Sequence, residues 1–307
     1  MRQIPNQRVA YFNGEIMAES DVRLSFRDRG YKFGDAVFDM ARTFGHRPFK
    51  LKEHVDRLYD SLSYCQIDPG IDADKMLRLS EQVLEINLPL LPPDGDYWLG
   101  QRVSRGFDKV EDETPDYPES SVIIECTPLP LKARAPHFRD GIKVIVPSVR
   151  RTPPSSLSPR AKTHNYLNMI MGDLEVHAQD DDAWAVLLDE NGNLCEGLGS
   201  NIFVVRGGVL LTPREDFVLP GVSRQTVIDL AVAADIDVRE TDIALFDGYT
   251  ADEAFLTSTS LCLCPVASIN GNKVGDGIPG PVTKTLLDAF SALVDHDFVG
   301  QYLARLD

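Results

Sequence analysis

The spacing of apolar residues alternates along the chain between the period of a strand and that of a helix, which predicts a mixed α/β fold. Two short apolar runs, residues 9–12 and 15–17, flank the pair Asn13-Gly14. That pair accepts the positive φ angles of a type I′ turn, so a β-hairpin is expected there. Further strands are expected at residues 36–44, 97–104, 121–127, 142–149, 183–189, 200–205 and 209–212. Helices are expected from about residue 52 onward and at about 76–86, 166–177, 223–234 and 282–294.

The chain has 307 residues, which exceeds what one hydrophobic core usually organises, so two domains are expected. Residues 128–136 carry Pro, Lys and Arg with little periodicity and are interpreted as the interdomain linker. The prediction is therefore a small N-terminal α/β domain, residues 1–127, and a large C-terminal α/β domain, residues 137–307.

The charge of the chain excludes two classes of partner. Lys and Arg number 31 against 47 Asp and Glu, a net charge of −16 at pH 7. Such a surface repels phosphate backbones and anionic headgroups, so neither nucleic acid nor a membrane surface is an expected partner. No apolar run approaches the length of a membrane span and no apolar leader begins the chain, so a cytoplasmic protein is expected.

The cysteines and histidines give no metal-binding pattern. The five cysteines form no CxxC pair, and the six histidines form neither HxxxH nor HExxH. We therefore predict no metal site, and we expect the thiols to be reduced and unreactive.

Residues 219–224, Leu-Pro-Gly-Val-Ser-Arg, place a glycine turn directly before a predicted helix, with Ser223 as the expected N-cap. Free backbone N–H groups and the positive end of the helix dipole then form a site for a phosphate or carboxylate. A second turn, Thr-Ser-Thr-Ser at 257–260, offers hydroxyl donors to the same anion. An ordinary capped helix and an ordinary loop are the alternative interpretations.

Two further residues are candidates for chemistry. Lys162 lies between a Pro-rich stretch and a predicted helix, and a lysine in an enclosed site can attack a carbonyl to form an imine. Glu196 stands in a turn of small residues that a flat ligand can approach closely. Taken singly, a solvated lysine at a helix start and an acid in a Gly-rich turn explain both. Together with the anion site, they are the three contacts that pyridoxal phosphate requires.

With these elements in place, the sequence resembles the class IV, or fold type IV, pyridoxal-phosphate aminotransferases. This group holds branched-chain aminotransferases, D-amino-acid aminotransferases and (R)-selective amine transaminases, and the resemblance covers nearly the whole chain. Its collinear motifs, beside the Lys162 segment, are YFNG at 11–14, DRGYKFGD at 28–35, EHVDRL at 53–58, EG at 196–197, LPGVSR at 219–224 and FLTST at 255–259.

The resemblance implies two α/β domains with pyridoxal 5′-phosphate in the cleft between them, assembled as a homodimer or higher homo-oligomer. It makes Lys162 the Schiff-base lysine and Glu196 the partner of the pyridine nitrogen. The other cofactor contacts that it implies are Arg57, Leu219, Val222, Ser223, Ser258, Thr259 and Tyr166. Arg57 is expected on the helix side opposite the apolar stripe, where its guanidinium is free to reach the phosphate.

The implied activity is transfer of an amino group to a 2-oxo acid such as 2-oxoglutarate or pyruvate. The donor is an amino acid, branched-chain-like or of the D series, or an (R)-primary amine, and the reaction is ping-pong. Lys162 carries a proton between the substrate Cα and the cofactor C4′. Two alternatives stay open: a lyase of the aminodeoxychorismate type, and a protein that binds pyridoxal phosphate without turnover.

Two departures from the family pattern concern the substrate. Tyr166 lies one residue nearer to Lys162 than the tyrosine of branched-chain enzymes, which leaves its contact with the ring hydroxyl open. Residues 106–113 are acidic and lack the Arg and His with which D-amino-acid enzymes bind a carboxylate. Tyr31, Arg42 and Arg102 are the remaining candidates for substrate contacts.

Overall fold

The computed structural model describes residues 7–109 and 120–306, so the first six residues and the acidic residues 111–113 lie outside the described residues. The chain divides into two compact units. Unit 1 comprises residues 1–129 and 161–165, and unit 2 comprises residues 130–160 and 166–307. The mixed α/β class expected from the periodicity is confirmed.

Unit 1 is an antiparallel sheet of six strands in the order β2-β1-β6-β5-β3-β4. Its elements are β1 (Val9–Phe12), β2 (Glu15–Ala18), η1 (Glu19–Asp21), α1 (Arg29–Phe33), β3 (Ala36–Phe44), β4 (Arg47–Phe49), α2 (Leu51–Cys65), α3 (Ala73–Asn87), η2 (Leu88–Leu90), β5 (Tyr97–Ser104) and β6 (Ser121–Pro128). The predicted hairpin is confirmed, with φ of 47° at Asn13 and 108° at Gly14.

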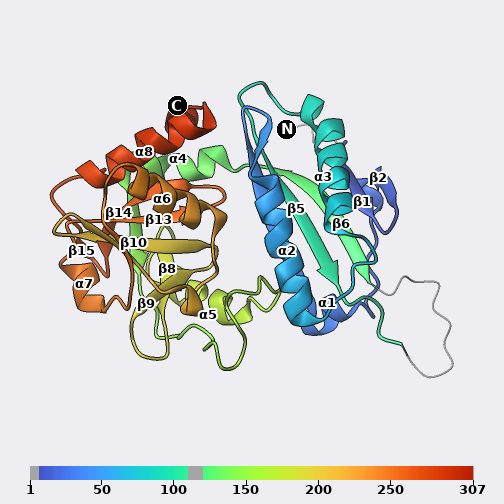
Figure 1. Cartoon of the computed structure of the whole chain (residues 1–307), viewed down its shortest axis with the longest axis horizontal. Helices are drawn as coiled ribbons and strands as arrows, with labels where there is room; N and C mark the ends of the chain where they lie inside the picture. Colours follow the sequence, from blue (N-terminus) through green and yellow to red (C-terminus); the bar gives the residue numbers. More distant parts are fainter. Residues whose placement is uncertain (1–6, 110–119, 307) are drawn as a thin grey trace. The chain divides into compact units, whose positions relative to one another are not determined.

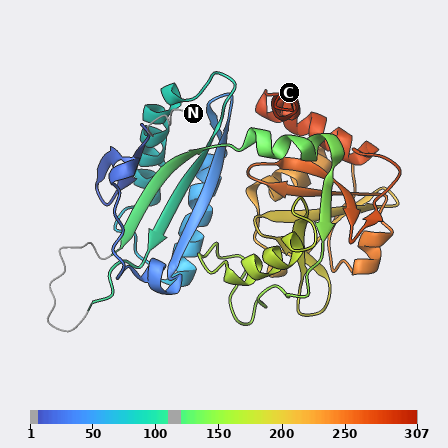
Figure 2. The same ribbon diagram turned by 180° about the vertical axis from the view of Figure 1, so that it is seen from behind.

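Helices α2 and α3 cover one face of this sheet, the face seen in Figure 1, and Figure 2 shows the strands from the opposite side. Apolar residues of both helices pack with those of the strands in one buried cluster, which includes Val37, Val55, Leu58, Met76, Val83, Leu99 and Ile124. Burial of this stripe is the main reason that the two amphipathic helices form. Because this packing holds α2 against the sheet, the side chains on the sheet-facing side of α2 have fixed positions.

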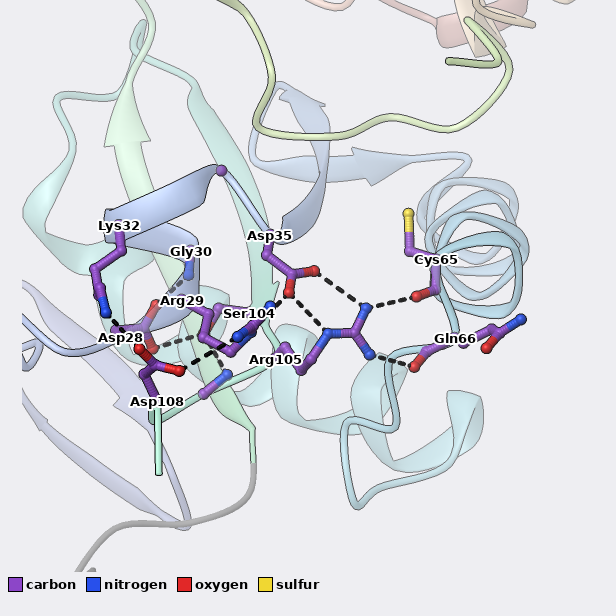
Figure 3. Close-up of polar contacts among 12 residues, drawn as sticks. Asp28, Arg29, Gly30, Lys32, Asp35, Cys65, Gln66, Ser104, Arg105 and Asp108 are labelled. Atoms are coloured by element: carbon purple, nitrogen blue, oxygen red, sulfur yellow. Dashed lines mark hydrogen bonds and ion pairs between the residues drawn. The ribbon is translucent and has the colours of Figure 1, made fainter. Parts of the chain in front are cut away.

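A buried carboxylate anchors the short helix α1 to the sheet (Figure 3). Asp28 is fully buried and caps α1 by accepting a hydrogen bond from the backbone N–H of Gly30 at 2.8 Å. Its second oxygen accepts from the hydroxyls of Ser104 on β5 at 2.6 Å and Ser121 on β6 at 2.7 Å. One side chain therefore ties α1, which carries Tyr31, to two strands.

An arginine joins the start of β3 to the end of α2 (Figure 3). Arg105 Nε donates to Asp35 at 2.8 Å, and its Nη atoms donate to the carbonyls of Cys65 and Gln66 at 2.8 and 2.7 Å. Arg29 donates to the same Asp35 carboxylate at 2.9 Å. Because Asp35 directly precedes β3, this cluster holds the first residues of that strand in place.

Unit 2 is a nine-stranded mixed sheet in the order β12-β11-β10-β13-β14-β7-β8-β9, with β15 paired to β14. Strand β9 also pairs with β10, so the strands from β10 round to β9 form a closed ring. Its elements are α4 (Leu131–Asp140), β7 (Ile142–Ile145), α5 (Leu167–His177), β8 (Trp184–Leu188), β9 (Leu194–Gly197), β10 (Ser200–Arg206), β11 (Val209–Thr212), η3 (Glu215–Phe217), α6 (Val222–Ala233), β12 (Val238–Glu240), α7 (Leu245–Tyr249), β13 (Glu253–Ser258), β14 (Cys262–Ile269), β15 (Asn272–Lys273), α8 (Pro281–Val294) and α9 (Phe298–Leu303).

The interpretation of residues 128–136 as a linker is wrong for most of the segment, since α4 begins at Leu131. Leu131, Ala135 and Phe138 are buried and lie at helical spacing, and Phe138 stacks on Tyr302 at 4.4 Å between ring centroids. Burial of this stripe outweighs the hydrogen bond that Pro136 cannot donate. The expected strand at 142–149 is also shorter and ends at Ile145.

A carboxylate from β13 caps helix α8. Glu253 Oε1 accepts from the backbone N–H of Val282 at 2.9 Å, and Oε2 accepts from that of Thr283 at 2.7 Å. Two N–H groups of the first helical turn, which have no partner within the helix, are satisfied in this way.

We predict that Glu253→Ala lowers the free energy of unfolding by about 1–2 kcal/mol, because both capping hydrogen bonds are lost. Urea denaturation followed by circular dichroism measures the change. Asp288→Ala removes an exposed ion pair with Lys284 on the same helix and is expected to cost less than about 0.5 kcal/mol. Equal effects of the two substitutions would contradict the capping role.

Candidate functional site

The residues singled out from the sequence divide between the two units. Unit 1 holds Tyr31, Arg42, Arg57, Arg102 and Lys162, and unit 2 holds Tyr166, Glu196, Leu219, Val222, Ser223, Ser258 and Thr259. Each unit is therefore described by itself.

Lys162 lies in a strap, residues 161–165, that runs along β3. Its carbonyl accepts a hydrogen bond from the backbone N–H of Phe38 at 3.0 Å, and His164 N donates to the carbonyl of Ala36 at 2.9 Å. The backbone N–H of Lys162 donates to Ser61 Oγ on α2 at 3.1 Å. The lysine is half-buried and precedes α5, which begins at Leu167, so the alternative of a solvated lysine at a helix start is wrong.

The ammonium group of Lys162 lies over an aromatic ring. Its Nζ is 4.5 Å from the centroid of Phe38, a residue of β3 whose side chain lies on the face of the sheet opposite α2 and α3. A cation over a ring face is held by the ring quadrupole without a hydrogen bond or a counter-charge. The backbone of the lysine is thus fixed by hydrogen bonds, and its ammonium group lies against the ring of Phe38.

Arg57 differs from the expectation that it faces away from the apolar stripe of its helix. It is buried, with about 9% of its surface exposed, and one carboxylate of β3 binds its guanidinium along one edge. Arg57 Nε and Nη2 donate to the two oxygens of Asp39 at 2.8 Å each. The helical wheel places Arg57 near the edge of the stripe, and Asp39 draws it toward the sheet.

His54 completes this buried cluster. Its Nδ1 lies 2.6 Å from Asp39 Oδ1, and both residues are almost wholly inaccessible to solvent. Burial alone would raise the pKa of Asp39, but Arg57 and His54 hold it well below the usual range for aspartate. Burial lowers the pKa of His54 despite the attraction of Asp39, so the imidazole is neutral at pH 7 and donates through Nδ1.

A pocket of about 360 Å³ lies within unit 1. Tyr31, Arg102 and His164 supply polar groups to its lining, and Leu24 and Ile123 supply apolar surface. Arg102 Cζ is 5.4 Å from the centroid of the same Phe38 ring that lies beside Lys162, and Nη2 pairs with Glu125 at 3.2 Å. Both cations therefore adjoin one ring, and the Arg102 guanidinium can meet a small anion near the lysine.

Arg42 has the contacts of a structural residue. It is 2% exposed, Nε donates to the carbonyl of Thr43 at 2.9 Å, and Cζ lies 4.0 Å from the Phe44 ring centroid. Its Nη2 is 3.8 Å from the buried carboxylate of Asp96. These contacts give it no exposed donor surface for a substrate.

In unit 2, Glu196 is buried on β9 and both of its oxygens are engaged. Oε1 accepts from Arg151 Nε at 2.8 Å, and Oε2 accepts from the backbone N–H of Leu219 at 2.9 Å. A carboxylate has about four acceptor sites, so this arrangement fixes the group and keeps further acceptor capacity. The contact with Leu219 also joins Glu196 to the loop that leads into α6.

The N-terminus of α6 lacks a side-chain cap. Gly221 is the N-cap, so the expected N-cap role of Ser223 is wrong. Ser223 lies inside the helix, and its hydroxyl donates instead to the carbonyl of Ser258 at 3.1 Å. A Cβ at Gly221 would lie 2.3 Å from Asn201 Oδ1, so only glycine lets the loop approach β10 this closely. The first N–H groups of a twelve-residue helix remain available for an anion.

The donor set of unit 2 fits the chemistry of a phosphorylated pyridine. Two buried hydroxyl oxygens, those of Ser200 and Thr257, have no hydrogen-bond partner among the described residues. Ser200 pairs with Gly197 beside Glu196, and Thr257 pairs with Asn201. Thr259 follows the end of β13, and Tyr166 is the half-buried N-cap of α5. Unsatisfied hydroxyls, an uncapped helix and a fixed carboxylate are thus gathered at one end of the ring of strands.

Comparison with known proteins decides the family. The profile of the family described as amino-transferase class IV matches residues 36–269, which is more than half of the chain. The chain belongs to the class IV aminotransferases. It is accordingly a transaminase, and the fold type IV class expected from the sequence motifs is confirmed.

Individual relatives of this class IV aminotransferase are named as branched-chain enzymes. A protein of Methanocaldococcus jannaschii, named as a candidate branched-chain-amino-acid aminotransferase, is 35% identical over 91% of this chain and 94% of its own length. The structure of the Escherichia coli branched-chain amino acid aminotransferase has a TM-score of 0.84 at 30% identity, covering 94% of this chain and 95% of its own. The T.th. branched-chain amino acid aminotransferase, solved with pyridoxamine 5′-phosphate, has a TM-score of 0.82 at 25% identity, covering 95% and 96%.

Sequence reasoning missed three residues of the class IV aminotransferase: Asp39, His54 and Arg151. A single acid within the apolar strand 36–44 was the available signal for Asp39, since a charge buried in a strand requires a partner. His54 sits three positions before Arg57 on the same helix face. No comparable signal marks Arg151, which lies 45 residues before Glu196 in the chain.

Two general features complete the description of residues 7–109 and 120–306. No helix in these ranges is long and apolar enough to cross a membrane. The same residues contain no group of His, Cys, Asp and Glu side chains that could hold a metal ion, and all five cysteines are free thiols.

The pocket histidine makes stability depend on pH. Burial, then the charge of Arg102 and last that of Lys162, lowers the pKa of His164 from 6.5 to about 4, and the opposing attraction of Asp28 ranks between those of the two cations. Between these two pH values the unfolded chain binds more protons than the folded one. Stability from this residue is therefore fully present above pH 6.5 and is lost as the pH falls toward 4.

We predict that the free energy of unfolding falls by about 2 kcal/mol less in His164→Gln than in the wild type when the pH is lowered from 6.5 to 4.5. The measurement is urea denaturation at both pH values for the wild type and the variant. His54 and His137, whose pKa values burial also lowers, contribute equally to both proteins, so only the difference in slope is informative. Parallel slopes would show that His164 titrates normally.

Proposed function

We propose that the protein is a pyridoxal 5′-phosphate-dependent aminotransferase that moves an amino group from a branched-chain-like L-amino acid to a 2-oxo acid such as 2-oxoglutarate. The observation that carries the proposal is the coexistence of a strapped lysine and a buried arginine in unit 1 with a buried carboxylate and an uncapped helix in unit 2. The names of the relatives support the choice of donor.

The cofactor contacts follow the chemistry of each side chain. Arg57, the α6 N-terminus and the hydroxyls of Ser223, Ser258 and Thr259 bind the phosphate, with Val222 as the first residue of α6. Glu196 would hold the ring nitrogen, Leu219 would pack against the ring, and Tyr166 would be the residue for the ring hydroxyl. When bound, pyridoxal phosphate supplies an aldehyde carbon that takes up the amino group and a ring that accepts electrons released at the substrate α carbon.

Lys162 is the residue of this chain that we assign to the reacting atoms. Its Nζ would hold the aldehyde carbon of the cofactor, and as general base and acid it would hold and move the proton taken from the substrate α carbon. The proton transfer requires a lysine whose backbone stays fixed. Three hydrogen bonds of the strap backbone meet that requirement, and the Phe38 ring lies beside the amine. Arg151 keeps the Glu196 carboxylate oriented throughout.

The pocket of unit 1 supports the choice of substrate. Its apolar lining accepts an aliphatic side chain, and Arg102 and Tyr31 offer donors to a carboxylate. Arg102 is paired through one nitrogen with Glu125, so its guanidinium can take a second partner. Arg42 is left out of the substrate site because its contacts are internal.

A homodimer is part of the proposal. Helix α5 exposes Leu167, Ile170, Met171 and Leu174, which share one face at helical spacing. An exposed apolar stripe of this kind is typical of a protein–protein interface. The partner that we propose is a second copy of this chain.

We predict that Lys162→Ala abolishes transamination, with a loss of at least about 10³-fold in kcat, because the proton carrier is removed. Product formation from L-leucine and 2-oxoglutarate measures the loss. Lys143→Ala, which removes an exposed lysine paired with Asp180, is the control and should retain full activity. Normal turnover by Lys162→Ala would refute the assignment.

We also predict that L-leucine converts the bound cofactor to its aminated form at least about 10-fold faster than D-alanine or (R)-1-phenylethylamine, because the apolar pocket and Arg102 suit a branched side chain with a carboxylate. The visible band of the enzyme-bound cofactor reports the rate of each half-reaction. Preference for D-alanine or the amine would overturn the donor class and leave transamination intact. Pyruvate released without an oxo-acid acceptor would indicate a lyase.

A further inference from the structure

The buried cluster of Asp39, His54 and Arg57 in unit 1 has a geometry that its contribution to stability does not explain. Asp39 is fully buried and accepts two hydrogen bonds from Arg57 and one from His54. Its remaining hydrogen bond comes from the backbone N–H of Met40 next to it, at 2.7 Å. Almost everything that Asp39 binds is therefore a side chain of α2.

A second buried carboxylate of the same unit provides the contrast. Asp96 accepts from the Thr43 hydroxyl at 2.5 Å and from the backbone N–H groups of Gly45 and His46 at 3.3 and 3.0 Å. These bonds close the turn between β3 and β4, which is a structural task. Asp96 also faces a buried arginine, Arg42, but at 3.8 Å, whereas both oxygens of Asp39 accept hydrogen bonds from Arg57 at 2.8 Å. A buried pair of this kind contributes little net stability, because desolvation offsets the attraction.

The edge of the guanidinium that Asp39 uses sets the direction of the other edge. Nε and Nη2 form the side edge of the planar group, and both donate to Asp39. The end edge, which carries Nη1, is directed away from that carboxylate, and Nη2 also lies 3.5 Å from His54 Nδ1. Asp39 thereby fixes the plane and the direction of the guanidinium, and a guanidinium of fixed orientation is suited to recognising phosphate.

The same two elements also hold Lys162. Ser61, one turn after Arg57 on α2, donates its hydroxyl to the Arg57 carbonyl at 3.0 Å and accepts the Lys162 N–H at 3.1 Å. On β3, Phe38 binds the Lys162 carbonyl, and the next residue, Asp39, binds the Arg57 side chain. One turn of α2 and two residues of β3 thus set the separation between a phosphate-binding arginine and the lysine.

We propose that Asp39 is a positioning residue, which acts through Arg57 to orient the guanidinium toward the phosphate of the cofactor while Lys162 holds its other end. His54 assists by donating through Nδ1 to the same carboxylate. The inference rests on the proposed function, because the proposed function assigns Arg57 to the phosphate. Asp39 touches neither cofactor nor substrate, and its effect is confined to ligands that carry a phosphate.

The test compares two ligands that differ only in that group. Full-length protein freed of cofactor is titrated with pyridoxal 5′-phosphate and with pyridoxal, and binding is followed by absorbance. Asp39→Asn keeps the shape of the side chain and removes its charge. We expect the dissociation constant for pyridoxal phosphate to rise about 10- to 100-fold, as for other residues that orient a binding group, while that for pyridoxal changes less than about twofold.

Asp96→Asn is the matched control. It removes the charge of another buried carboxylate of unit 1, so it should lower the unfolding midpoint while leaving the ratio of the two dissociation constants unchanged. Asp39→Glu retains the charge, so the ratio of its two dissociation constants should lie between those of Asp39→Asn and the wild type. In an Arg57→Met background, Asp39→Asn should alter the ratio no further, because its route of action is gone.

Several outcomes would overturn the proposal. They are an equal loss of affinity for both ligands, a changed ratio in Asp96→Asn, and a further change in the Arg57→Met background. If Asp39→Asn fails to fold, two other comparisons decide the question. The first compares Asp39→Glu with the wild type, and the second compares Arg57→Met with the double variant that carries Arg57→Met and Asp39→Asn. Failure of the proposed function is separate: the wild type would then not bind pyridoxal phosphate through Lys162 at all.

Discussion

The strap of residues 161–165 on β3 is the constraint on which the rest of the candidate site depends. A lysine that both attaches to a ligand and moves protons must be held firmly at its backbone and loosely at its amine. Here the fixing is done by hydrogen bonds to Phe38, Ala36 and Ser61, while the amine lies against a ring face.

Local charge and overall charge have opposite signs in this protein. The chain carries a net charge of −16, yet Arg57, Arg102 and Lys162 gather within unit 1 around β3. The excess of acid repels large polyanions, whereas three cations attract a small anionic ligand. Each guanidinium has its own carboxylate, Asp39 for Arg57 and Glu125 for Arg102. The carboxylates differ in burial, and so the first pair is rigid while the second can exchange partners.

Much of the fold could be predicted from the sequence where local rules decide. The strands at 36–44, 97–104 and 209–212 have the predicted bounds, and the Asn13-Gly14 hairpin has the expected turn, because period and turn chemistry act over a few residues. Helix α4 was missed because only three apolar positions define its face and Pro136 interrupts it. The return of residues 161–165 to unit 1 could not be predicted, since it depends on pairing with a strand more than a hundred residues earlier.

In the candidate site too, residues within sequence motifs could be predicted, whereas their partners on distant elements could not. Motif resemblance pointed to Lys162, Arg57 and Glu196, but their partners Asp39 and Arg151 lie on elements that sequence spacing does not connect. The prediction that Arg57 is free failed for this reason. A helical wheel describes one helix and leaves out the strand against which it packs.

The closed ring of unit 2 gives Glu196 a mechanical property that the strap of unit 1 does not share. Strand β9 has hydrogen-bonded neighbours on both sides, β8 through Gly197 and Leu194, and β10 through Gly197 and Glu196. A displacement of Glu196 therefore requires two ladders to open together, whereas the strap pairs with a single strand, β3. The Glu196 carboxylate is thus the more rigidly held of the two groups.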